Sequence, residues 1–223
     1  MRQTTIIFPV LGGLFLALLL PPGESRRCEA HEIPDNFVER SLSIVVRNDT
    51  VVLTYRAGLN IDTMRSAMQR WGCPAAKYAD SLSDQDLSEN FRRVAFDKIS
   101  AGLKVSLNAK PISLRKVSCE PSPRHHFSLV ARYELELGKP KKPIELELVD
   151  ENFTAYEGAV RYSLKAMGSA MVLQSNVAPI IVRAERYELA NLPSERRMEV
   201  CRIRAKLGFL TPLPQTEEGN SDG

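Results

Sequence analysis

Residues 127–137, FSLVARYELEL, alternate almost without interruption between apolar and polar side chains, and they decide the fold class. Phe127, Tyr133 and Leu135 fall on one side of an extended chain, while Arg132 and the two glutamates fall on the other. A period of two predicts a β-strand, because successive side chains of a strand point to opposite faces. We therefore expect one face of this strand to be buried against a second layer of protein.

A similar stretch nearer the amino terminus predicts a β-hairpin. Residues 42–46 alternate, Asn48 and Asp49 mark a turn, and residues 51–55 resume the alternation. Further runs of this kind follow at residues 103–107, 112–117, 127–137, 144–148, 160–164, 171–173, 180–182 and 200–207. The first two of these runs are expected to form another hairpin. The sequence thus predicts a mainly β fold, an antiparallel β-sandwich of the immunoglobulin-like (Ig-like) type.

Two helices interrupt the alternation near residues 60–102. Asn60 is a suitable N-cap for a first helix, whose apolar residues recur at a spacing near 3.6. Ser83 and Asp86 resemble a capping box for a second helix, which runs to the end of this segment. The sandwich is therefore expected to carry a two-helix insertion at this place.

The composition is that of an ordinary globular protein. The chain has 223 residues, 43% hydrophobic and 26% charged, which excludes collagen-like, mucin-like and fully disordered chains. Lys and Arg number 30 against 27 Asp and Glu, and this small, evenly spread excess gives no indication of nucleic-acid binding. With neither a repeat nor a linker, we expect a single domain at 31–210, followed by a disordered tail at 211–223.

Residues 1–30 have the order of features of a secretory signal peptide. Arg2 precedes an apolar run at residues 6–20, which ends at Pro21 and Pro22. This run is shorter than the roughly 20 apolar residues that a membrane-spanning helix needs. We therefore predict export to the periplasm or the extracellular space; the alternative is an uncleaved segment that anchors the chain.

Two cleavage sites fit the preference for small residues and differ in their chemical consequences. Cleavage after Ser25 keeps four cysteines, an even number that permits two disulfides in an oxidising compartment. Cleavage after Ala30 removes Cys28 and makes His31 the first residue of the exported chain.

The histidines provide a metal-site hypothesis. A free α-amine and imidazole on His31 would offer two nitrogen ligands to one nickel, cobalt or copper ion. His125 is the candidate for a third nitrogen, and Glu32 or Asp35 for a carboxylate. His125 and its neighbour His126 point to opposite faces of the predicted strand, so both cannot bind one ion without a bulge. The simpler interpretation is an unliganded terminus.

No serine-hydrolase elbow, zinc-protease helix, phosphate-binding loop or dinucleotide fingerprint occurs in the sequence. Asp150 and Glu151 stand beside Asn152 in a predicted turn, where we expect a solvated pair rather than a general acid and base. Asn48 and Asn152 each begin an Asn-X-Thr glycosylation acceptor sequence.

Two segments resemble a known family. Residues 31–37, HEIPDNF, with the hairpin that follows, and residues 149–153, VDENF, with Gly158, are similar to the exported soluble (extracytoplasmic) domain of nickel/cobalt transporters. Glu32 stands where that family has proline after the histidine, and the sequence has neither the transmembrane bundle nor a histidine-rich loop. The resemblance implies a detached extracytoplasmic domain that presents metal or docks onto a membrane partner.

The predicted function is therefore a non-enzymatic, exported binding domain of the cell envelope that is accessory to a metal-ion transporter. Its expected partner is a membrane transporter or another envelope protein, and not a nucleic acid. The alternatives are a metal-binding or metal-delivery protein that uses His31, and an enzyme with an unrecognised carboxylate site.

Overall fold

The computed structural model describes residues 35–121, 127–138, 140, 142–177, 185–188 and 192–210. The predicted signal peptide at 1–30, the predicted tail at 211–223 and the strand predicted at 180–182 lie outside these residues. No helix within the described ranges combines the length and the apolar character needed to span a bilayer.

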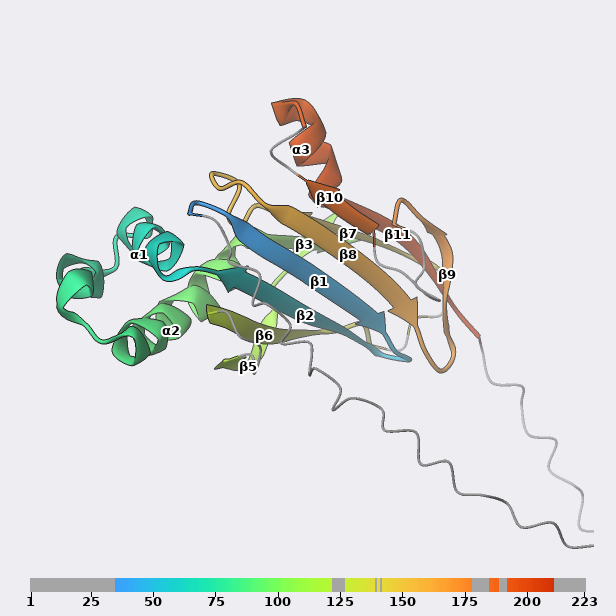
Figure 1. Ribbon diagram of the computed structural model, residues 1–223. Coiled ribbons are helices and arrows are strands. Elements are labelled where there is room, and N and C mark those ends of the chain that lie inside the picture. Colours follow the sequence, from blue (N-terminus) through green and yellow to red (C-terminus); the bar gives the residue numbers. More distant parts are fainter. Residues whose placement is uncertain are drawn as a thin grey trace, which may run out of the picture. The chain divides into compact units, whose positions relative to one another are not determined.

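The described chain is mainly β, as predicted, and its strands form two sheets (Figure 1). The six-stranded sheet has the order β10 (Glu185–Glu188), β8 (Ala159–Ala166), β1 (Val38–Val46), β2 (Thr50–Leu59), β6 (Phe127–Glu136), β5 (Arg115–Pro121). The five-stranded sheet has the order β4 (Lys110–Ile112), β3 (Leu103–Leu107), β7 (Ile144–Asp150), β11 (Arg202–Phe209), β9 (Ala170–Ser175). Neighbouring strands run antiparallel except β1 and β8, which are parallel.

The first hairpin is confirmed. Strands β1 and β2 pair with Val46 opposite Val51, and the Arg47 N–H donates to the Thr50 carbonyl at 2.7 Å. Strand β2 then pairs with β6, the strand predicted from the alternation at residues 127–137. The longest alternating segment therefore lies inside a sheet.

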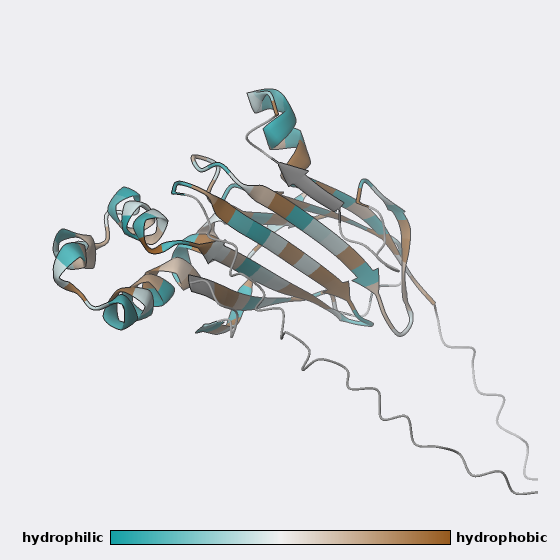
Figure 2. Ribbon diagram, viewed as in Figure 1, coloured by the Kyte–Doolittle hydropathy of each residue, from teal (hydrophilic) through white to brown (hydrophobic). Residues whose placement is uncertain are grey.

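Buried side chains of both sheets belong to one hydrophobic core. Leu42, Leu53 and Tyr133 come from the six-stranded sheet, Leu148 and Ile203 come from the five-stranded sheet, and none is more than 1% exposed. Figure 2 shows the corresponding alternation of hydrophobic and hydrophilic residues along β1 and β8. Because burying a side chain of this size stabilises by roughly 1.5–3 kcal/mol, this shared core holds the two layers together.

The helical insertion is confirmed, with one addition. Helix α1 (Ile61–Arg70) is capped by Asn60, whose side chain accepts from the Thr63 N–H, and α2 (Asp84–Gly102) is capped by Ser83. A 3₁₀ helix, η1 (Pro74–Ser81), joins them and was not predicted.

The hairpin predicted at 103–117 is wrong in its second half. Strand β3 pairs with β4, but the next strand, β5, crosses to the other sheet and pairs with β6. Pro111 has no N–H to donate, which is why β4 is short and lies at the edge of its sheet.

The strand predicted at 200–207 begins later, at Arg202, because a short helix, α3 (Ser194–Val200), precedes it. None of the residues of α3 is buried, so apolar periodicity could not indicate this helix. Strand β10 was also not predicted.

Candidate functional site

The two predicted metal ligands, His31 and His125, lie outside the described residues, as does His126. Among the residues that the structure does describe, no three His, Cys, Asp or Glu side chains gather where they could hold a metal ion. Cys73, Cys119 and Cys201 are free thiols.

Asp150 and Asn152 are buried, which overturns the prediction of a solvated turn at this point. Their exposed fractions are 1% and 7%, and Arg40 on β1, at 4%, lies against them. The Arg40 guanidinium is 3.6 Å from the Asp150 carboxylate and also donates to the Asn152 carbonyl. Asn152 in turn donates from its backbone and its side chain to Asp150 Oδ1, at 3.0 Å in both cases.

Two tyrosines and a cysteine surround this buried pair. Burial raises the pKa of the Asp150 carboxyl, and the Arg40 cation opposes the shift. Burial also raises the pKa of the Tyr55 and Tyr162 phenols, so both stay neutral. The Cys201 thiol has a raised pKa for the same reason. With these side chains in the core, the ion pair ties β1 to the end of β7 rather than facing a ligand.

The burial of Asn152 also bears on the glycosylation motifs. Its amide nitrogen donates to the Ile99 carbonyl at 3.1 Å, so this nitrogen is occupied inside the fold. The Asn152 acceptor site is therefore inaccessible in the folded chain. Asn48 is exposed in the β1–β2 turn, where its side-chain oxygen accepts from the Ser169 N–H at 2.8 Å.

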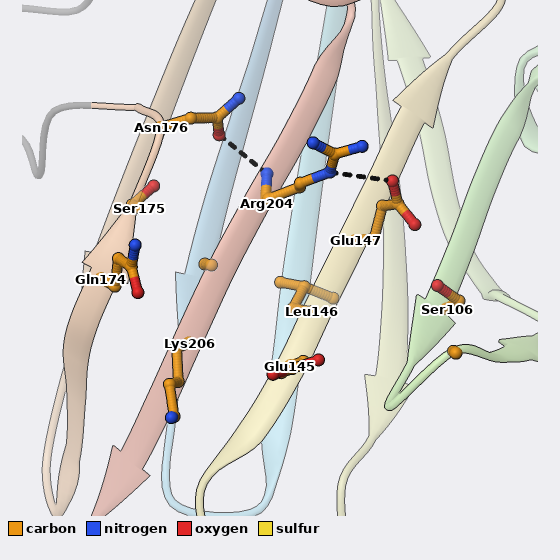
Figure 3. A pocket seen from close by; sticks show the side chains of 11 residues that line it. Ser106, Glu145, Leu146, Glu147, Gln174, Ser175, Asn176, Arg204 and Lys206 are labelled. Atoms are coloured by element: carbon orange, nitrogen blue, oxygen red, sulfur yellow. Dashed lines mark hydrogen bonds and ion pairs between the residues drawn. The ribbon is translucent and has the colours of Figure 1, made fainter.

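A polar hollow of about 490 Å³ opens on the face of the five-stranded sheet that points away from the core (Figure 3). Strands β3, β7, β11 and β9 contribute side chains to it, with further residues from the turns beside them. The lining residues are Ser106, Ala109, Glu145, Leu146, Glu147, Gln174, Ser175, Asn176, Arg204, Ala205 and Lys206.

One side of the hollow is a fixed hydrogen-bonded network. Arg204 Nε lies 3.2 Å from Glu147 Oε1, and Arg202 Nε lies 3.5 Å from the same oxygen. The Asn176 side chain accepts from the Arg204 N–H and donates to the Arg202 carbonyl, each at 2.8 Å. Figure 3 shows Arg204 held between Asn176 and Glu147 in this network.

The other side of the hollow carries opposite charges that are not engaged. Glu145 and Lys206 occupy directly opposed positions of β7 and β11, yet neither side chain forms an ion pair with a residue that the structure describes. Gln174, which is opposite Lys206 on β9, is exposed and adds an amide. The hollow can therefore offer an anion, a cation and an amide to a ligand at the same time.

The charged residues of the hollow follow a visible pattern in the sequence, but the pattern of one strand alone does not predict the site. Apolar residues of β7 alternate with Glu145 and Glu147, and those of β11 alternate with Arg204 and Lys206. Each strand has its charges on one face, but only the pairing of β7 with β11 brings the two sets together. That pairing joins distant segments and cannot be read from either one.

No protein-family model matches this chain, and a comparison with curated proteins also gave no match.

Proposed function

We propose that this chain is a non-enzymatic, exported binding domain of the cell envelope that docks onto a membrane transporter for a metal ion through the polar hollow. The observation that carries the proposal is the unengaged pair Glu145 and Lys206 on neighbouring, hydrogen-bonded strands. Opposite charges fixed on a rigid sheet select a partner with the complementary pattern and exclude partners that place like charges there.

A transporter is the proposed partner because residues 31–37 and 149–153 resemble the extracytoplasmic domain of nickel/cobalt transporters. Asp150 and Asn152 of the second segment lie in the core, so their role in this chain is structural. The Ig-like assignment belongs to the same proposal, and the single core shared by the two sheets supports it.

Photo-crosslinking in the native host tests this docking site. A photoreactive residue at Gln174, in the hollow, is compared with one at Lys98, an exposed position of α2. We expect the Gln174 probe to capture a membrane-spanning metal transporter, identified by mass spectrometry. The Lys98 probe should not capture it.

The charge reversal Lys206→Glu provides the matched variant. It should reduce the yield of the Gln174 adduct by about tenfold, because it places two carboxylates opposite each other and repels an acidic partner group. Equal adducts from both probes, or an adduct that Lys206→Glu does not change, would contradict docking at the hollow. Capture of a protein that is not a transporter would contradict the choice of partner.

A further inference from the structure

The six-stranded sheet presents a group of cations on its face opposite the core. Arg56 on β2, Arg132 on β6, and Arg161 and Lys165 on β8 are all exposed. They alternate with core residues such as Tyr55, so they point away from the other sheet. None of the four forms an ion pair with a residue that the structure describes.

The strand register arranges these arginines in two adjacent rows. In one row Ser41 of β1 lies between Arg161 and Arg56. Since neighbouring strands are about 4.8 Å apart, the backbones of these two arginines are roughly 10 Å apart. In the next row Arg132 lies opposite Thr54 and is a diagonal neighbour of Arg56, about 7–8 Å away.

Short hydroxyl side chains fill the space between the arginines. Ser163, Ser43 and Thr54 follow one another in the row that continues to Arg132, and all are partly buried. Each hydroxyl can both donate and accept a hydrogen bond. We call Ser41, Ser43, Thr54, Ser163, Arg56, Arg132 and Arg161 the arginine–serine face.

Glu39, Glu120, Glu134 and Glu136 lie on the same face of the sheet as these cations. Glu134, in the following row, is engaged by Arg115. Glu120 lies at the edge, opposite Val130 of β6, and Glu39 has an interaction of its own. In the polar hollow, by contrast, Glu147 binds both Arg202 and Arg204. Unlike these two, the three arginines of the arginine–serine face have no carboxylate partner among the described residues.

We propose that the arginine–serine face binds an anionic polysaccharide, a chain of sugars that carry sulfate or carboxylate groups. A guanidinium binds such groups through two parallel hydrogen bonds, and the spaced arginines would meet successive charged groups of one chain. The serine hydroxyls between them would meet sugar hydroxyls and ester oxygens.

A narrow polymer fits this surface better than a protein or a membrane. Protein interfaces depend on large aromatic or aliphatic anchors. The aliphatic side chains on this face, Val45, Val52 and Val130, are small and at most partly exposed, so they offer no such anchor. A planar membrane would meet the protruding arginines but not the partly buried hydroxyls that lie between them. Figure 1 shows β8, β1 and β2 side by side in the six-stranded sheet, so the residues of the arginine–serine face lie on neighbouring strands.

The test measures binding of heparin, a sulfated polysaccharide, to the full exported chain by calorimetry, with neutral dextran as the uncharged control. The variant Arg56→Gln/Arg132→Gln/Arg161→Gln should bind heparin about a hundredfold more weakly, because each lost charge-assisted contact costs several-fold to tenfold in affinity. The matched variant Arg202→Gln/Arg204→Gln/Lys206→Gln removes the same charge from the other sheet and should change affinity by less than about threefold. Circular dichroism checks that both variants fold.

A second variant keeps every arginine. Ser43→Asp places a carboxylate in the middle of the face, and we expect it to weaken heparin binding by about tenfold through charge repulsion. If the two triple variants lose heparin affinity equally, net charge alone explains the binding, and the proposal is overturned. So would binding to phosphatidylglycerol vesicles without binding to heparin, or competition by free sulfate at the concentration at which heparin competes. Docking at the polar hollow is tested separately, by the yield of the Gln174 adduct. Failure of one proposal therefore leaves the other intact.

Discussion

At the scale of single residues, the ion pair between Arg40 and Asp150 is the most consequential feature of the core. Both side chains are almost fully buried, and each depends on the other and on Asn152 for polar contacts. A buried pair is weak support for net stability, because desolvating two charges offsets most of their attraction. Breaking the pair is costly, since it leaves one charge in the core without a counter-charge.

Asp150→Asn tests this dependence. The substitution preserves the shape of the side chain but leaves the Arg40 guanidinium uncompensated, so the free energy of unfolding should fall by about 3–5 kcal/mol. Urea unfolding followed by circular dichroism measures the change. Glu199→Gln removes a partner from the exposed pair between Arg196 and Glu199, and it should cost less than about 1 kcal/mol. Similar losses in the two variants would show that Arg40 does not rely on Asp150.

Cys119 gives a prediction for alkaline pH. Burial raises the pKa of its thiol from 9.0 to about 11, while the Arg92 cation opposes the shift. Because the folded pKa is higher than the unfolded one, this thiol contributes stability that is fully present below pH 9 and is lost as the pH rises through about 11.

Peptide-resolved alkylation with iodoacetamide measures this pKa directly. In the native chain the rate at Cys119 should rise with a midpoint near pH 11, and in urea near pH 9. At pH 8 the thiolate fraction, and with it the native rate, should be roughly a hundredfold lower than in urea. Arg92→Gln should raise the native midpoint further. A native midpoint at or below pH 9 would refute the burial argument.

The error at Asp150 has a specific physical origin. Asp, Glu and Asn in succession are typical of a solvated turn, and that composition determined the prediction. The strand period gave the opposite information, because Ile144, Leu146, Leu148 and Asp150 share one face of β7, and this face is buried. Near a strand end, the alternation was the better guide than the composition.

At the scale of elements, one close backbone contact fixes where β1 begins. The Val38 N–H donates to the Glu157 carbonyl at 2.8 Å, and Gly158 lies directly against Val38 with φ +144°. A Cβ atom at position 158 would lie 2.0 Å from the Val38 carbonyl oxygen. Only glycine allows the segment before β8 to approach β1 this closely.

Gly158→Ala should therefore lower the free energy of unfolding by about 3 kcal/mol, because backbone atoms must separate to admit the methyl group. Gly72→Ala is the matched control. Gly72 also has a positive φ, +66°, but an added Cβ would meet nothing within 4 Å, so only the backbone cost of about 1 kcal/mol applies. Urea unfolding of both variants checks the difference. Equal losses would mean that strain, and not the contact with Val38, makes glycine necessary at 158.

The elements differ in how much the sequence revealed of them. The alternation of β6 and the caps of α1 and α2 are local signals, and these elements were predicted correctly. The crossing of β5 to the other sheet depends on tertiary pairing, and α3 has no buried residue that could give an apolar period. To predict the hollow and the arginine–serine face, one would need the register between strands, and the sequence of a single segment does not contain it.

At the scale of the whole molecule, the predicted cleavage of the signal peptide would decide whether His31 can bind a metal ion through its α-amine. Cleavage after Ala30 would make His31 the first residue, and a chain that begins there should bind nickel or copper through its terminal amine and imidazole. Intact mass and N-terminal sequencing establish the first residue, and calorimetry with Ni²⁺ or Cu²⁺ measures binding. Binding should be lost in His31→Ala. A chain that begins at Arg26 would rule out terminal chelation, whatever the calorimetry shows.

The parallel pairing of β1 with β8 also has a consequence for biogenesis. Arg40 and Val160 are neighbours in the sheet although they are far apart along the chain, so β1 has a neighbour on only one side until β8 has been made. Such long-range pairing slows folding and leaves a strand edge open to other chains. A polypeptide that crosses a membrane in order from its amino terminus would expose this edge throughout its passage, and we expect a holding chaperone in the receiving compartment to raise the yield of folded protein.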